Sequence, residues 1–233
     1  MTCGVPQGTV LSPLLYIIYV LELSYLKLNG SIYSYADDTA LVVTGETWQS
    51  VANIAENSLS KIIEWFSYNN LSLNYNKTVY ITFSNSIKTS PNICISINKV
   101  VKTKYLGVTF DQHLRWNFHI SELNMKLHKL YTFYNISKHF LNIHWLKNTY
   151  YNLTQSLTEY GIVVWGNATQ THINCLQIAQ NTSLKIIYHK PRLYSSKNLY
   201  SEAKLLTVKQ LYYKKTLYYM SKKKFNKTGR SYL

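Results

Sequence analysis

Two adjacent acidic residues separate two short apolar segments in the stretch SYADDTALVV, and this pair constrains the fold more than any other feature of the chain. The flanking segments have the aromatic and β-branched content of strands, so the pattern predicts a β-hairpin with Asp37 and Asp38 at its tip. A turn accepts one Asp easily, but two neighbouring carboxylates repel each other unless a cation binds them. The chain has three Asp residues in all, and the third is Asp111. The pair is therefore explained less well by an ordinary turn than by a cation-binding tip.

The segment before this hairpin, CGVPQGTVLSPLL, combines a glycine-rich loop with a helix start. Gly4, Pro6 and Gly8 predict a loop whose backbone can approach a ligand closely. Ser12 is a favourable N-cap and Pro13 suits the first helical position. We expect a buried helix over about 13–27, because the residues that follow are almost all apolar.

The rest of the chain changes from mixed to helical patterning. Apolar residues recur at helical spacing between Val51 and Phe66, which predicts an amphipathic helix over about 46–70. Strands are expected in LSLNYNKTVYITFS, ICISI and KVVKTKYLGVTFD. Beyond Leu114 helices are expected at about 116–140, 144–160, 173–189 and 205–223. The fold class is therefore α+β, with an α+β first part over 1–112 and a helical second part over 113–233.

The positive charge of the chain is concentrated in its second part. Residues 1–100 contain five Lys or Arg and six Asp or Glu, whereas residues 101–233 contain twenty and four, a net charge of +16. This asymmetry indicates a polyanionic partner such as a nucleic acid. A basic surface that is only solvated is the alternative, because a chain rich in Lys, Asn, Tyr and Ile can reflect AT-rich codons. Codon bias would enrich Lys in both parts alike.

Cysteine spacing and hydropathy argue against a zinc-binding, a disulfide-stabilised, a membrane-spanning or a secreted protein. Cys3, Cys94 and Cys175 form no C-x-x-C pair, so neither a zinc site nor a disulfide framework is indicated, and a reducing compartment fits. The longest apolar run, PLLYIIYVL, is far shorter than the roughly 20 residues that span a bilayer. It also lacks the features of a signal peptide. We expect an intracellular protein, in the nucleus or the cytoplasm, with no membrane partner; no oligomeric state is indicated.

Four motifs in order carry a resemblance to a known family. GVPQGTVLSPLL, YADDT, LNYNKT and YLGVTFD resemble motifs B, C, D and E of reverse transcriptases, in particular those of non-LTR (LINE-type) retrotransposons of the jockey-like kind. EYGIVVWG and LQIAQNTSLKII resemble the segment that follows the polymerase core in those elements. The resemblance extends from residue 3 to about 190. It implies the C-terminal part of a polymerase palm, an antiparallel sheet with packed helices, followed by a basic, helical, thumb-like region.

The resemblance also implies a reaction and its reactants. An RNA-directed DNA polymerase transfers nucleotides from dNTP to a DNA primer on an RNA template, with two Mg²⁺ (or Mn²⁺) ions about 3.5 to 4 Å apart. Asp37 is then the principal metal ligand and Asp38 the supporting one. Lys77 matches the motif D lysine that reaches the pyrophosphate and can act as a general acid. A lone Lys before a strand is unremarkable by itself, so this role follows from the resemblance alone.

The remaining implied site residues bind substrate and primer. Pro6, Gln7 and Gly8 match the segment that lines the nucleotide pocket, and Tyr35 is expected near the primer end. The turn of the last hairpin, formed by Tyr105, Leu106 and Gly107, matches the primer grip. A helix-entry loop and a plain edge strand are the alternative interpretations of these two segments.

The chain also departs from the family pattern. The motif A strand with the first metal-binding Asp, and the fingers, lie upstream of the glycine-rich loop in this family, whereas this sequence opens at motif B. Asp111 follows the primer-grip hairpin and is not expected to reach the metals. We therefore expect no polymerase activity from this chain by itself. A non-catalytic nucleic-acid-binding module and a non-functional retroelement relic stay open, the latter with exposed apolar faces that favour aggregation.

Overall fold

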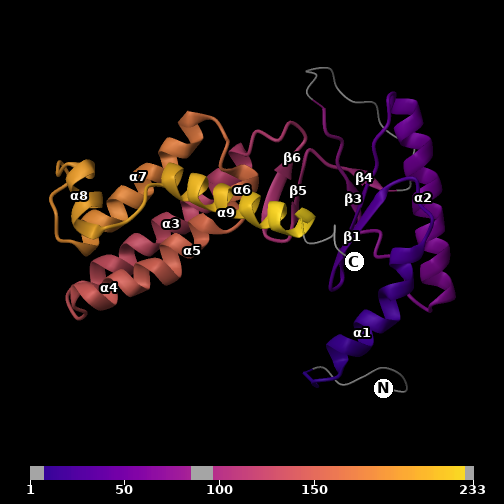
Figure 1. Cartoon of the computed structure of the whole chain (residues 1–233), viewed down its shortest axis with the longest axis horizontal. Helices are drawn as coiled ribbons and strands as arrows, with labels where there is room; N and C mark the ends of the chain where they lie inside the picture. The colour runs from indigo at the N-terminus through magenta and orange to yellow at the C-terminus, as the bar shows by residue number, and fades with distance from the viewer. Residues whose placement is uncertain (1–7, 85–96, 229–233) are drawn as a thin grey trace. The chain divides into compact units, whose positions relative to one another are not determined.

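The computed structural model of the chain describes residues 8–84 and 97–228, and Figure 1 shows their helices and strands. The chain divides into two compact units, Met1–Gly107 and Val108–Leu233, which we call unit 1 and unit 2. The mixture of helices with short sheets confirms the expected α+β class. None of the helices in the described ranges combines the length and the apolarity needed to cross a bilayer.

Unit 1 is built around a hairpin and one long helix. The antiparallel hairpin pairs β1 (Ser31–Tyr35) with β2 (Asp38–Val42), as expected from the sequence. Helix α2 (Trp48–Tyr68) begins in a capping box, in which the Thr47 side chain accepts a hydrogen bond from the main-chain N–H of Ser50. The buried side chains of this unit are mainly Leu23, Ile62 and Trp65, which pack together with half-buried neighbours from the hairpin. The described residues of unit 1 therefore have only a small core.

The remaining strands of unit 1 are shorter than expected. Strand β3 (Val79–Tyr80) pairs with β4 (Asn98–Lys99) in parallel, so the purely antiparallel sheet that we expected is wrong for this pair. The strand expected over LSLNYNKTVYITFS is reduced to two residues. Its first half is interrupted by a turn, in which the carbonyl oxygen of Asn74 accepts the N–H of Thr78. Strand β5 (Lys102–Tyr105) completes the unit. The strand expected in ICISI lies, except for Ile97, outside the described residues.

The apolar helix at the start of the described chain is exposed, which contradicts the buried helix expected over 13–27. It consists of α1 (Ser12–Val20), in which no residue is buried, and a 3₁₀ segment (Leu21–Tyr25) that buries only Leu23. The side chains of Leu14, Ile17 and Ile18 are 54–58 % exposed. The periodicity correctly indicated a helix. The prediction that this helix is buried was wrong, because the small core among the described residues of unit 1 does not cover these side chains.

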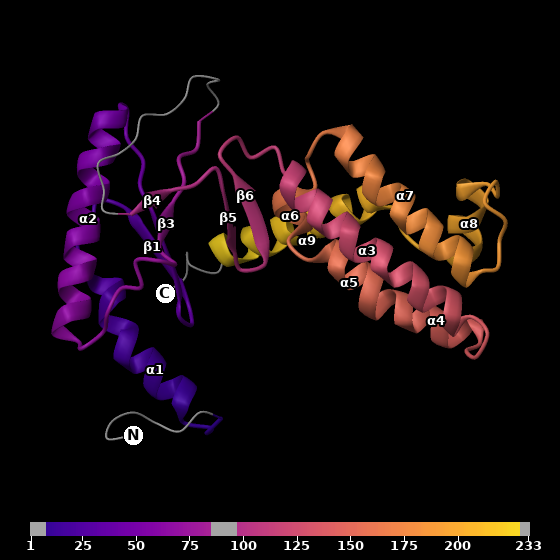
Figure 2. The ribbon, with the colours of Figure 1, turned by 180° about the vertical axis from the view of Figure 1, so that it is seen from behind.

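Unit 2 is helical after its first strand, β6 (Val108–Asp111). The expected helices are present as α3 (Asn117–Ser137), α7 (Gln170–Ile187), α9 (Val208–Thr228) and a continuous run of α4 (Ile143–Tyr150), a π-helical turn (Tyr151–Gln155) and α5 (Ser156–Glu159). Two short helices, α6 (Ile162–Trp165) and α8 (Ser196–Ala203), were not expected. Helices α3 and α7 pack along each other, and both views show them side by side (Figure 2).

The core of unit 2 is much larger than the core formed by the described residues of unit 1. Side chains from α3, α6, α7 and α9 form one cluster, which includes the fully buried Leu127, Trp165 and Leu176. A second cluster, around Tyr134 and Tyr150, packs α3 and α4 against α7 and α8. Burial of apolar area is the main favourable contribution to folding, and among the described residues most of it lies in unit 2.

Candidate functional site

The acidic residues foreseen from the sequence lie at the tip of the β1–β2 hairpin, which we call the acidic hairpin (Ser31–Val42). Tyr35 pairs with Asp38, so only Ala36 and Asp37 form the turn. Ala36 has φ 51°, a left-handed conformation at the first turn position, where two-residue hairpin turns require a positive φ. Glycine is the usual residue at such a position, so an alanine here indicates that surrounding contacts hold the turn.

One such contact comes from helix α1. The hydroxyl of Tyr16 donates a hydrogen bond of 3.0 Å to the carbonyl oxygen of Ala36. Burial, and secondly the negative charge of Asp37, raise the pKa of the Tyr16 phenol, so this hydroxyl stays protonated and keeps donating at neutral pH. Sequence analysis did not identify Tyr16. The available signal was a residue with a polar tip within an apolar helix that precedes the hairpin.

The two carboxylates are exposed and adjacent. Asp37 lies in the turn and Asp38 is the first residue of β2, and both side chains are open to solvent. Carboxylate oxygens are the ligands that Mg²⁺ prefers, and this ion usually binds through one or two carboxylates while it keeps several waters. The donor set of the tip fits a hydrated divalent ion of this kind. Within residues 8–84 and 97–228, no group of three or more His, Cys, Asp or Glu side chains could hold a metal ion.

The third Asp has a structural role. Asp111 is 5 % exposed, and its carboxylate accepts hydrogen bonds from the main-chain N–H groups of His113, Arg115 and Trp116, the last at 2.8 Å. These bonds hold the loop that leads into helix α3. The expectation that Asp111 does not serve the metals is consistent with this use of its carboxylate.

The other residues implied for catalysis and nucleotide binding are dispersed. Pro6 and Gln7 lie outside the described residues, and Gly8 is exposed with φ +86° and open space around its Cα. Tyr35 is 68 % exposed beside the tip. Lys77 is exposed in the Asn74 turn, where its main-chain N–H donates to the Asn74 carbonyl oxygen. The structure thus joins Tyr35 to the acidic pair through strand pairing, and it positions Lys77 on a separate turn.

The turn implied as a primer grip is a tight hairpin turn. Leu106 has φ 46° and Gly107 has φ 79°, the two positive values that a type I′ turn requires. The hydroxyl of Tyr105 donates a hydrogen bond of 3.2 Å to the carbonyl oxygen of Tyr33 in β1. Within unit 1, therefore, the residue that begins this turn is tied to a strand of the acidic hairpin. Nothing in the sequence pattern signalled this contact.

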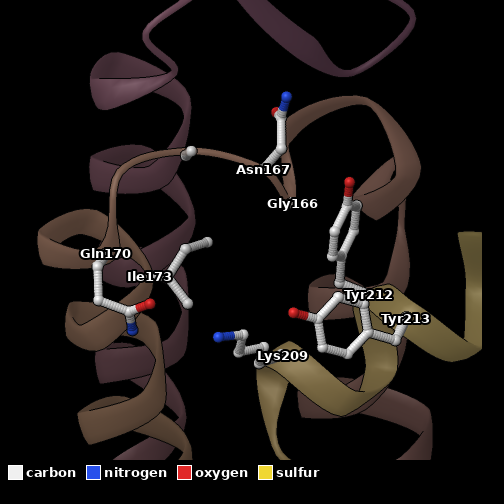
Figure 3. A pocket seen from close by; sticks show the side chains of 8 residues that line it. Gly166, Asn167, Gln170, Ile173, Lys209, Tyr212 and Tyr213 are labelled. Carbon is white, nitrogen blue, oxygen red and sulfur yellow. The ribbon is translucent and has the colours of Figure 1, made fainter.

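A small cavity lies in unit 2, between the start of α7 and the start of α9 (Figure 3). Its volume is about 150 Å³, and Lys209 is the only charged residue among those that line it. A side chain at Gly166 would come within 2.3 Å of Cδ2 of Tyr212, so the tyrosine ring occupies the space beside this glycine. The lining residues include no carboxylate, imidazole or thiol.

Comparison with known proteins confirms the resemblance seen in the motifs. Residues 1–110 match the family described as reverse transcriptase (RNA-dependent DNA polymerase). The chain is 29% identical over 201 residues to the RNA-directed DNA polymerase from mobile element jockey of Drosophila funebris. It is 27% identical over 206 residues to the probable RNA-directed DNA polymerase from transposon X-element of Drosophila melanogaster.

These similarities cover most of this chain but little of the relatives. The two alignments include 81% and 80% of this chain and 22% of each relative, so the chain spans about a fifth of the length of the curated relatives it matches. A shorter match, 25% identical over 138 residues, is to the Pol polyprotein from type-1 retrotransposable element R1 2 of Nasonia vitripennis. No solved structure is significantly similar to the chain.

Proposed function

We propose that this chain, which carries a reverse transcriptase domain match over residues 1–110 and is homologous to jockey-like retrotransposon polymerases, is part of an RNA-directed DNA polymerase. The observation that carries the proposal is the pair of adjacent, exposed carboxylates, Asp37 and Asp38, at a hairpin tip within the matched region. The substrates are a DNA primer, an RNA template and dNTP. Unit 1 would then be palm and unit 2 would be thumb and extension, with the functional boundary expected near 112.

The residues around the tip have distinct roles in this proposal. Bound Mg²⁺ would activate the primer 3′-hydroxyl and neutralise the leaving pyrophosphate. Asp37 and Asp38 hold the ion, and the hydrogen bond from Tyr16 to Ala36 keeps the turn that presents them. Tyr35 contacts the primer end, and Tyr105 to Gly107 hold the primer strand. Lys77 supplies a positive charge for the pyrophosphate, and Pro6 to Gly8 line the nucleotide pocket.

The metal role is tested by titrating the chain with Mn²⁺ and following the free ion by electron paramagnetic resonance. We expect weak binding that Mg²⁺ displaces and that Asp37→Asn removes. Glu46→Gln is the matched control, because Glu46 is also exposed in unit 1 and its change removes the same charge. Equal Mn²⁺ binding by the wild-type chain and Asp37→Asn would overturn the assignment of the ion to the acidic hairpin.

The catalytic role is tested in a longer polymerase. Residues 1–110 replace the matching segment of the jockey polymerase, and a second, smaller exchange transfers only Ser31–Val42. Primer extension on an RNA template should persist in an exchange that folds, and Asp37→Asn should abolish it. An exchange that folds and binds template and primer, but does not extend the primer with Asp37 present, would refute the polymerase proposal.

A second candidate function is a nucleic-acid-binding module without catalysis. The supporting observation is the charge of unit 2, which contains eighteen Lys or Arg and four Asp or Glu between Val108 and Leu233. For a module of this kind, the logarithm of the binding constant for duplex or single strands falls linearly with the logarithm of the salt concentration. Metal-dependent extension separates the two functions, because only the polymerase requires Asp37.

A further inference from the structure

A basic groove lies on unit 2 where helices α3 and α7 both end. Its volume is about 820 Å³. The α7 residues that line it recur at helical spacing, from Ile178 through Thr182 to Lys185, and therefore lie on one face of the helix. The segment from His189 to Arg192, which connects α7 to α8, contributes further lining, and Lys138 at the end of α3 completes it. We call this site the α3–α7 groove.

The connecting segment is held in place by hydrogen bonds. The ammonium group of Lys185 donates a bond of 2.6 Å to the carbonyl oxygen of Arg192, and the N–H of Lys190 donates to the carbonyl oxygen of Lys185 at 2.9 Å. The ammonium of Lys190 forms an ion pair of 2.8 Å with Glu202 of α8, and it also lies 4.5 Å from the centre of the Tyr194 ring. The groove wall is thus a tethered turn, and Lys190 is neutralised by Glu202.

The other cations of the groove have no acidic partner among the described residues. None of the four acidic side chains of unit 2 pairs with Lys138, Lys185 or Arg192. Asp111 bonds to its own loop, Glu122 to Thr109, Glu159 to Lys215 and Glu202 to Lys190. Three positive charges, those of Lys138, Lys185 and Arg192, therefore face the same groove without a carboxylate to balance them.

The ends of two helices offset part of this charge. The C-termini of α3 and α7 lie at the groove, and each carries about half a negative charge from the helix dipole. The two helix ends together balance about one of the three cations, which leaves about two positive charges in excess. The partial charges of the two helix ends therefore account for only about one of the three cations in the groove.

We propose that the α3–α7 groove binds the sugar–phosphate backbone of a nucleic-acid strand. The proposal rests on the proposed function, which makes template and primer the polyanions available to this chain. Ile178, Ile186 and Pro191 contribute apolar lining, and Lys138, Lys185 and Arg192 in the same lining provide positive charges for phosphate groups. Phosphate contacts of this kind fix the position of a strand without reading its sequence.

The test measures binding of a fluorescein-labelled, 20-nucleotide single-stranded RNA to the full chain by fluorescence anisotropy over a salt series. The groove variant carries Lys138→Gln, Lys185→Gln and Arg192→Gln. The control variant carries Lys126→Gln, Lys129→Gln and Lys197→Gln, which remove the same charge from exposed positions of α3 and α8. We expect the groove variant to lose roughly tenfold in affinity and its salt slope to fall by about 2, since each phosphate contact with a single strand contributes about 0.7. The control should change by less than about twofold.

Two comparisons make the outcome decisive. Lys185→Arg keeps the charge and should bind as the wild type does, which separates charge from a change in folding. Equal losses in the groove and control variants, or equal binding of poly-glutamate and RNA by the wild-type chain, would overturn the groove proposal. The Mn²⁺ titration of the acidic hairpin should give the same result for the groove variant and the wild type, so failure of the metal assignment at Asp37 is measured independently of failure at the groove.

Discussion

The hydrogen bonds of Asp111 give the sharpest test of how this chain uses its few acidic residues. In the sequence Asp111 is the one Asp outside the hairpin tip and thus a formal candidate for a third metal ligand. In the structure its carboxylate accepts three main-chain N–H groups in a loop where Leu114 and Trp116 have positive φ values of 51° and 64°. Left-handed residues of this kind cost about 1 kcal/mol or more each, which the carboxylate offsets.

The change Asp111→Asn keeps one oxygen acceptor and removes the charge. It loses at least one charge-assisted hydrogen bond, worth about 1.5–3 kcal/mol, and weakens the others. We expect a loss of about 3 kcal/mol in the free energy of unfolding, which lowers the melting temperature by about 10 °C for a unit of this size. Asp111→Ala leaves all three N–H groups without their acceptor and should cost about 4 kcal/mol or more.

The assay is thermal and urea unfolding of the full chain, followed by far-UV circular dichroism, once with Mg²⁺ and once with EDTA. Glu46→Gln is the control, since this exposed carboxylate takes part in none of the hydrogen bonds or ion pairs found among the described residues. A structural role predicts the same destabilisation with and without Mg²⁺. The reasoning fails if Asp111→Asn costs less than about 0.5 kcal/mol, or if Mg²⁺ stabilises the wild type and this gain disappears in the variant.

Three further predictions concern activity, alkaline stability and packing. The purified 233-residue chain should not extend a primer processively, because two carboxylates hold a metal pair poorly; extension that Asp37→Asn abolishes would contradict this. Burial raises the pKa of Tyr134 from 10.0 to about 12, so its contribution to stability is complete below pH 10 and is lost as the pH rises through 12, at a cost of about 3 kcal/mol. Tyr134→Phe should therefore flatten the dependence of unfolding free energy on pH between 10 and 12, and an unchanged slope would assign that loss to other groups. Gly166→Ala places a methyl group against Tyr212 and should cost about 1–3 kcal/mol in urea unfolding; a neutral result would show that the ring moves aside freely.

Much of the local structure follows from sequence patterns because it depends on neighbours a few residues apart. Helix α2 was predicted over about 46–70 by apolar spacing, and it forms over Trp48–Tyr68. The capping box at Thr47 was not predicted. The acidic hairpin was predicted from strand composition around two Asp residues, and the observed turn lies where it was expected. The long helices of unit 2 also match their expected ranges within a few residues.

The candidate site was predicted in part. Asp37 and Asp38 were recognised because two adjacent carboxylates are unusual at a turn. The hydrogen bonds from Tyr16 to Ala36 and from Tyr105 to Tyr33 were not recognised, because each joins residues at least 20 positions apart in the chain. No local sequence pattern shows which distant carbonyl oxygen each of these two tyrosines reaches.

The sequence by itself thus determined the type of most elements, the acidic tip, the basic second part and the reverse transcriptase resemblance. Only the tertiary structure decided which apolar faces are buried, that Asp111 caps a loop, and that α3 and α7 end together at a basic groove. The physical reason is that helix and turn formation depend on short-range geometry, whereas burial and charge clustering depend on which distant surfaces meet. An apolar helix such as α1 has the same sequence pattern whether or not another surface covers it.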